Sequence, residues 1–240
     1  MSKALIIVDV QNDFCAGGAL ATERGADVAA LISEYVENNH HRYDAIVATQ
    51  DWHIDPGSHF SDTPDYVDSW PVHCVAKSEG AQIHENLDTD YIEAYFRKGR
   101  FEAAYSGFEG LLAPEDEVAT GEHEPGADAS EDGPQTPLSE WLDERGIEFV
   151  DVVGIATDYC VSATARDAVD AGYETRVLLD LTAPVHEDKL DDVVAELEDE
   201  GVEVVVQAVR RAAVHHAVLA HEAGCAVVVD DELEGLVEPS

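Results

Sequence analysis

The chain has 240 residues and a mass of 26.0 kDa, enough for one domain with a sizeable core, although two small domains would also fit. Its 52 acidic and 13 basic residues give a formal net charge of −39, so the surface repels phosphate groups, and we expect neither nucleic acid nor an anionic membrane as a partner. We interpret the acidic excess as an adaptation to concentrated salt, with an acidic protein of dilute surroundings as the alternative.

The N-terminal segment MSKALIIVDVQ does not resemble a signal peptide, because its apolar run is short, is interrupted by Asp9 and lacks a small-residue cleavage site. No stretch approaches the roughly 18 apolar residues that a membrane-spanning helix needs. The four cysteines are dispersed and form no CxxC pair, which is typical of thiols that stay reduced. We therefore expect a soluble, cytoplasmic protein.

Apolar and amphipathic segments alternate along the first half of the chain. ALIIVDV (4–10) is a near-continuous apolar run, which predicts a strand buried on both faces. A helical pattern follows at about 26–38, and DAIVATQDW (44–52) is a second predicted strand. EAYFRKG (93–99) is compatible with a third.

The second half repeats this alternation. EFVDVVGIA (148–156) predicts another buried strand, and CVSATARDAVDAG (160–172) a helix closed by a glycine. YETRVLLDL (173–181) is the next predicted strand and HEDKLDDVVAELEDEG (186–201) the next helix. Alternating strands and helices with short connections form βαβ units, so we expect a three-layer α/β/α fold with a mostly parallel central sheet.

Two segments depart from this pattern. Residues 113–137 are rich in acidic residues, glycine and proline, which predicts a long surface loop. Residues from about 207 have a helical pattern and then the short apolar run AVVVD. We therefore divide the chain into a principal domain over 1–206 and a C-terminal extension of unknown role over 207–240.

Three residues that can carry chemistry fall at the carboxyl ends of predicted strands, where sites gather in open parallel sheets. They are Asp9, Lys98 and Cys160, the last at the turn from a strand into a helix. A helix N-terminus lowers the pKa of a thiol, so we predict Cys160 as a nucleophile, with Asp9 as its base and Lys98 holding both charges. Taken singly, a buried inert cysteine, a turn-forming aspartate and a solvated lysine are the alternatives.

A second group of polar residues follows the second predicted strand. In DWHIDPGSHF (51–60), Asp51 and His53 share a face if the strand continues, His59 returns after a turn, and His73 comes later. One carboxylate and three imidazoles suit a divalent ion such as zinc, iron or manganese and leave positions for water or substrate. Capping or solvent-facing side chains are the alternative, but four ligands behind one strand favour one divalent metal ion.

Four blocks of the chain, in order, resemble one known family. IVDVQNDFCAGGAL, DWHIDPGSHFSDTPDYVDSWPVHC, KGRFEAAYSGFEG and VVGIATDYCVSATARDAV are similar to the corresponding blocks of the nicotinamidases (pyrazinamidases), which are isochorismatase-like cysteine hydrolases. The resemblance covers roughly residues 3–112 and 138–206. It implies an isochorismatase-like fold and the hydrolysis of nicotinamide to nicotinate and ammonia in NAD salvage, with pyrazinamide as a further substrate.

The resemblance also implies a role for each site residue. The implied catalytic triad is Asp9, Lys98 and Cys160. The implied metal ligands are Asp51, His53, His59 and His73. The implied pocket for the nicotinamide ring comprises Phe14, Trp70, Tyr105 and Ile155. The family's cis peptide falls at Ile155–Ala156, and the N–H groups of Ala156 and Cys160 match its oxyanion hole.

Two other functions stay open at this point. One is an isochorismatase-like hydrolase of another amide or a vinyl ether, although isochorismatases share the fold and the cysteine but lack the Asp/His metal set. The other is a non-catalytic, metal-bound binding protein, which would have no need of a nucleophile and a base at one edge of the sheet. The sequence leaves open the metal, self-association into a homo-oligomer and the preference among nicotinamide analogues.

Overall fold

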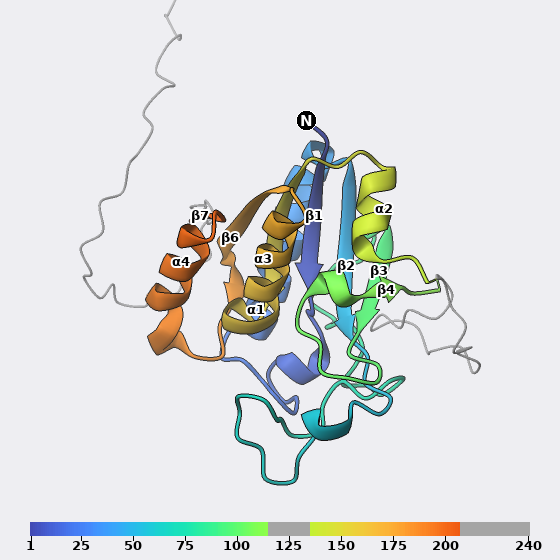
Figure 1. Ribbon diagram of the computed structural model, residues 1–240, viewed down its shortest axis with the longest axis vertical. Helices are drawn as coiled ribbons and strands as arrows, with labels where there is room; N and C mark the ends of the chain where they lie inside the picture. Colours follow the sequence, from blue (N-terminus) through green and yellow to red (C-terminus); the bar gives the residue numbers. More distant parts are fainter. Residues whose placement is uncertain (115–134, 207–240) are drawn as a thin grey trace, which may run out of the picture. The chain divides into compact units, whose positions relative to one another are not determined.

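A computed structural model describes residues 1–114 and 135–206 of the chain. The strands are β1 (Lys3–Val8), β2 (Ala45–Asp51), β3 (Ala94–Lys98), β4 (Leu111–Leu112), β5 (Phe149–Ile155), β6 (Glu174–Ala183) and β7 (Glu203–Val205). They form one seven-stranded sheet in the order β4-β3-β2-β1-β5-β6-β7 (Figure 1). Only the β3–β4 pair is antiparallel, so the predicted mostly parallel sheet is confirmed.

The helices lie on both faces of this sheet. They are α1 (Gly25–Asn39), α2 (Leu138–Glu144), α3 (Ser162–Asp170) and α4 (Leu190–Asp199). Apolar residues of α1 pack on one face, and those of α2, α3 and α4 pack on the other (Figure 1). This is the predicted three-layer α/β/α arrangement.

The central strand β1 shows why the sequence forms this core. Ala4, Ile6 and Val8 belong to the core under α2, α3 and α4, while Leu5 and Ile7 belong to the core under α1. Successive side chains of a strand point to opposite faces, so a continuous apolar run supplies both cores. Burying each large aliphatic side chain contributes about 1.5–3 kcal/mol.

The predicted boundaries shift where the backbone turns. β1 ends at Val8 because Asp9 has a φ of +47°, in the left-handed region that few non-glycine residues adopt. The helix predicted from residue 160 begins at Ser162, after a π-helical turn over Thr157–Val161. Helix α2 and the edge strands β4 and β7 were not predicted.

The strand order places a switch in chain direction between β1 and β5. From β1 the chain moves outward through β2 and β3 and later returns to the other side of β1 as β5. Ligands of open α/β sheets bind at such a switch point, outside the carboxyl ends of the strands. The arrowheads of β1 and β2 point to this edge, where the connections between β2 and β4 gather (Figure 1).

Most of the predicted surface loop 113–137 and the whole extension 207–240 lie outside the described residues. The two ends of the loop meet, because the Leu112 N–H donates to the Thr136 carbonyl at 2.9 Å. Within the described ranges, no helix combines the length and the apolar character needed to cross a membrane.

Candidate active site

The three residues predicted as a catalytic group meet at the switch point. Asp9 follows β1, Lys98 ends β3, and Cys160 lies in the π-helical turn after β5. The Lys98 Nζ atom is 2.9 Å from Asp9 Oδ2 and 3.5 Å from Cys160 Sγ. All three side chains are buried. Segments far apart in the sequence therefore bring a thiol, a carboxylate and an ammonium group into contact.

Lys98 also links this group to the predicted metal ligands. Its ammonium donates to Asp51 Oδ1 and, at 3.3 Å, to the Ala104 carbonyl. One buried cation is thus shared by two carboxylates, Asp9 and Asp51. Burial alone would lower the pKa of Lys98, but Asp51, Asp9 and Cys160 together raise that pKa well above its ordinary value. The side chain therefore stays an ammonium.

The thiol of Cys160 differs from the prediction. Burial raises the pKa of Cys160 well above its ordinary value, Lys98 offsets part of the rise, and Asp9 and Asp51 add to it. The prediction of a lowered pKa was wrong, because desolvation and two carboxylates outweigh one ammonium and a helix end. The resting thiol is neutral, so a neighbouring base must remove its proton. Burial likewise raises the pKa of Asp9, although Lys98 opposes it.

The predicted metal ligands form a second, adjoining cluster. Ring nitrogens of His53, His59 and His73 all lie within 4.8 Å of one another. Asp51 Oδ2 is 3.6 Å from His53 Nε2 and 3.8 Å from His73 Nε2. Lys98 and His53 outweigh the effect of burial and hold the pKa of Asp51 below its ordinary value, so it is a carboxylate.

Backbone carbonyls fix the orientation of two of these rings. His53 Nδ1 is 2.6 Å from the Gly99 carbonyl, and His73 Nδ1 is 2.7 Å from the Pro71 carbonyl. Each contact leaves Nε2 directed to Asp51, as in metal sites where a second group sets the ring's tautomer. Gly99 has a φ of +69°, and a Cβ there would lie 2.6 Å from His53 Cε1, so the close approach requires glycine.

Two observations test whether this cluster suits a metal ion. His53 Nε2 and His59 Nδ1 are buried and have no hydrogen-bond partner among the described residues. Burial lowers the pKa of His59 to about 4 and also lowers that of His73, so these rings are neutral and offer lone pairs. Buried polar atoms without partners are costly unless something binds them. The donor set therefore fits a divalent cation.

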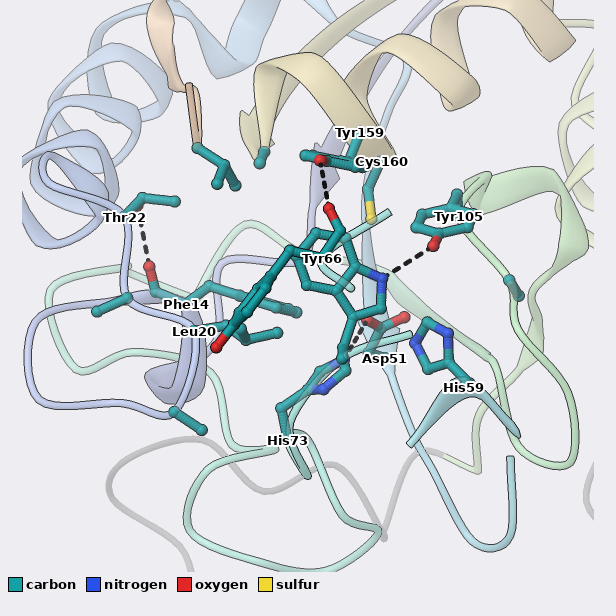
Figure 2. A pocket seen from close by; sticks show the side chains of 16 residues that line it. Phe14, Leu20, Thr22, Asp51, His59, Tyr66, His73, Tyr105, Tyr159 and Cys160 are labelled. Atoms are coloured by element: carbon teal, nitrogen blue, oxygen red, sulfur yellow. Dashed lines mark hydrogen bonds and ion pairs between the residues drawn. The ribbon is translucent and has the colours of Figure 1, made fainter. Parts of the chain in front are cut away.

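Both clusters face a cavity of about 300 Å³, which suits a small ligand (Figure 2). The side chains of Asp51, His59, His73 and Cys160 line it together with several aromatic rings. The aromatic residues in its wall are Phe14, Tyr66, Trp70, Tyr105 and Tyr159. Trp70 Nε1 donates to the Tyr105 hydroxyl at 3.0 Å, which fixes the two rings relative to each other.

Most of the residues predicted for the pocket lie in its wall. Phe14, Trp70, Tyr105 and Ala156 line the cavity, and the peptide bond between Ile155 and Ala156 is cis as expected. Ile155 itself is fully buried and belongs to the core under α1, so it is not part of the wall. Alternation along β5 turns its side chain away from the cavity.

Several residues of the site were missed by the sequence analysis. Tyr66, Tyr159 and Leu20 line the cavity, but they lie in loops or turns where no periodic signal exists. The Gln11 side chain forms two hydrogen bonds of 2.9 Å with the Asp51 backbone: its Nε2 donates to the carbonyl, and its Oε1 accepts from the N–H. Thr49 contacts Asp9 and shares a face of β2 with Asp51, so alternation from Asp51 could have identified it.

A buried thiol, carboxylate and ammonium group meet at the switch point of a parallel sheet, beside a small aromatic cavity, and these are the groups that a cysteine-dependent hydrolase uses. The sequence profile of the isochorismatase domain matches residues 3–116 and 132–209. The chain therefore belongs to the isochorismatase-domain family.

One curated protein and two solved structures are similar to this chain over most of its length. The nicotinamidase/pyrazinamidase of Mycobacterium tuberculosis is 51% identical over 206 residues, covering 85% of this chain and 98% of that protein. Among solved structures, PnC1 from L. infantum in complex with nicotinate superimposes with a TM-score of 0.68 at 34% identity and covers 85% of this chain and 92% of its own. The pyrazinamidase of Pyrococcus horikoshii in complex with zinc gives a TM-score of 0.65 at 30% identity. This match covers 85% of this chain and 99% of the pyrazinamidase chain.

Proposed function

We propose that this chain is an amidohydrolase that converts nicotinamide to nicotinate and ammonia, supplying NAD salvage, and that it also accepts pyrazinamide. The observation that carries the proposal is the position of Lys98. Its ammonium contacts the base Asp9 and also Cys160 and Asp51, and these last two residues line one small aromatic cavity. The Mycobacterium tuberculosis relative, named a nicotinamidase/pyrazinamidase, and the similar structure in complex with nicotinate support this choice of amide.

The cavity matches a flat heteroaromatic ring that carries one carboxamide. Phe14, Trp70 and Tyr105 would enclose the ring, and the carboxamide would lie at Cys160. Asp51, His53, His59 and His73 would hold one divalent ion, either zinc, iron or manganese. Such an ion, when bound, supplies a Lewis acid that attracts the ring nitrogen and water.

The proposed first half-reaction forms a thioester. Asp9 takes the proton of Cys160, and the sulfur's electron pair attacks the carboxamide carbon. The N–H groups of Ala156 and Cys160 would bind the oxyanion. Asp9 then gives its proton to the amide nitrogen, the C–N bond breaks, and ammonia leaves. Lys98 stays positive throughout and stabilises the carboxylate and the thiolate in turn.

The second half-reaction releases the acid. Water attacks the thioester carbon while Asp9 takes one of its protons, the C–S bond breaks, and the sulfur recovers the proton from Asp9. The sum is nicotinamide and water giving nicotinate and ammonia. The same Asp9 carboxyl thus serves as base in one step and as acid in the next.

Nicotinate and ammonia release by the purified, metal-loaded protein tests this proposal. Cys160→Ala should lower kcat by about 10⁴-fold or more. Cys15→Ala is the matched control, because Cys15 is also a buried thiol but packs in the core under α1 and not in the cavity wall. Benzamide, which lacks the ring nitrogen, should react with a kcat/KM lower by about 100-fold. A Cys160→Ala protein that retains wild-type turnover would disprove the mechanism.

The cellular location and the surrounding solvent are also part of the proposal. The thiols of Cys15, Cys74 and Cys160 are free, which supports a reducing, cytoplasmic setting. Adaptation to concentrated salt, expected from the net charge of −39, stays a prediction. Loss of fold and activity on dialysis into dilute buffer would support it, and full activity there would contradict it.

A further inference from the structure

The hydroxyl of Thr49 contacts Asp9 at two points. Its Oγ1 atom donates to Asp9 Oδ1 at 2.6 Å and accepts from the Asp9 backbone N–H at 3.2 Å. Both residues are fully buried. Asp9 adopts a left-handed φ of +47° directly after β1, so the contact from β2 fixes its backbone and its carboxylate together.

These two contacts assign different tasks to the two carboxylate oxygens. A hydroxyl has one proton, and the structure gives Thr49 no acceptor other than Asp9 Oδ1 within the described part of the chain. One lone pair of Oδ1 is therefore occupied by the Thr49 proton, which makes Oδ1 a weaker proton acceptor than it would be without Thr49. Oδ2 forms an ion pair with Lys98 Nζ at 2.9 Å and, in the same described residues, accepts no hydrogen bond from a hydroxyl or a backbone N–H.

Packing keeps the Thr49 side chain in this orientation. Its methyl group lies against Gly107, where a Cβ would approach Thr49 Cγ2 to 2.8 Å and Thr164 Cγ2 to 3.4 Å. Thr164 in turn donates to the Cys160 carbonyl at 2.6 Å and accepts from the Gly107 N–H at 2.8 Å. The base on one side and the nucleophile on the other are thus each held by a threonine beside the same glycine.

We propose that Thr49 is a positioning residue that reserves Oδ1 of Asp9, so that Oδ2 is the atom that receives the proton of Cys160. In that step the S–H bond breaks, its electron pair stays on sulfur, and the proton passes to Oδ2. The inference rests on the proposed function, because it assigns an atom within the same reaction.

Three substitutions at this position test the proposal. Thr49→Val keeps the shape and removes the hydroxyl, Thr49→Ser keeps the hydroxyl and removes the methyl, and Thr49→Ala removes both. With nicotinamide we expect Thr49→Val to lower kcat by about 10- to 100-fold, part of what a general base contributes, with KM within about twofold. Thr49→Ser should stay within about threefold of wild type.

Thr175→Val is the matched control, because Thr175 is also a buried strand residue whose hydroxyl donates, at 3.1 Å, to the Tyr173 carbonyl away from the site. It should lose stability without losing kcat. If Thr49→Val does not fold, the comparison of Thr49→Ala with Thr49→Ser carries the test. Equal kcat in the serine variant and in the variant without a hydroxyl would overturn the proposal.

A second measurement separates this inference from the choice of substrate. The rate at which iodoacetamide alkylates Cys160, followed on its own peptide by mass spectrometry, needs no substrate. It should fall in Thr49→Val and recover in Thr49→Ser. If the wild type does not hydrolyse nicotinamide, the proposed function fails, and the alkylation rates still decide the role of Thr49. Unchanged alkylation in Thr49→Val would reject that role.

Discussion

Two clusters of buried charge lie at opposite edges of the same sheet and differ in how completely their groups are paired. At the amino edge one carboxylate, Asp151, is shared by two cations. Arg176 donates to it at 2.8 and 2.9 Å, Lys3 approaches to 2.6 Å, and the Tyr43 hydroxyl donates at 2.6 Å. Both oxygens of Asp151 therefore have partners.

At the carboxyl edge one cation, Lys98, is shared by two carboxylates and a thiol. The charge there is negative in excess, and buried nitrogens of His53 and His59 have no hydrogen-bond partner among the described residues. A fully paired cluster can only stabilise the fold. The incompletely paired cluster can still accept a proton, a cation and a substrate, which is what a site requires.

Removing the shared cation should have the largest effect. Lys98→Met leaves Asp9 and Asp51 buried without compensation, so we expect a loss of about 3–5 kcal/mol in the free energy of unfolding. Turnover of nicotinamide should fall below detection in the protein that still folds. Urea denaturation and ammonia release measure the two effects. Lys3→Met is the control, since Arg176 still pairs with Asp151, and its kcat should not change.

Metal binding should have the next largest effect, and it should act through the cluster at the carboxyl edge only. A chelator should abolish turnover, and an added divalent ion at 100 times its Kd should stabilise the protein by about 2.7 kcal/mol. The metal should raise the Tm of the wild type but not that of His59→Asn. His40→Asn, which changes a histidine stacked on Tyr91, should keep the rise in Tm. Activity that survives exhaustive chelation with no metal left by elemental analysis would refute the metal requirement.

Breaking the paired cluster should affect stability alone. Asp151→Asn leaves Lys3 and Arg176 without a carboxylate and should cost about 3 kcal/mol, while kcat per folded molecule stays within about twofold. The exposed pair of Arg166 and Glu196 gives the scale for comparison, because Glu196→Gln should cost only about 0.5 kcal/mol. A large fall in kcat for Asp151→Asn would show that the two edges are coupled.

The contrast between these clusters also explains what the sequence could predict. Buried parallel strands are continuous apolar runs, so β1 and β5 were visible, and the polar residues at their ends pointed to Asp9 and Cys160. Strands β4 and β7, of two and three residues, are too short to show a period. The raised pKa of Cys160 depends on burial by loops and on both carboxylates, and none of these is local in the sequence.

Removing the Tyr43 hydroxyl should cost less stability than removing the Asp151 charge, and the cost should depend on pH with a distinctive sign. Burial and Asp151 raise the pKa of Tyr43 above its ordinary value, so the folded protein keeps this phenol protonated after the unfolded chain has ionised it. The stability that Tyr43 contributes is therefore complete below a pH of about 10 and is lost as the pH rises further. Tyr43→Phe should cost about 1 kcal/mol at pH 7. In urea titrations its deficit relative to wild type should shrink between about pH 10 and 11, and a constant deficit would mean that the Tyr43 pKa is not raised.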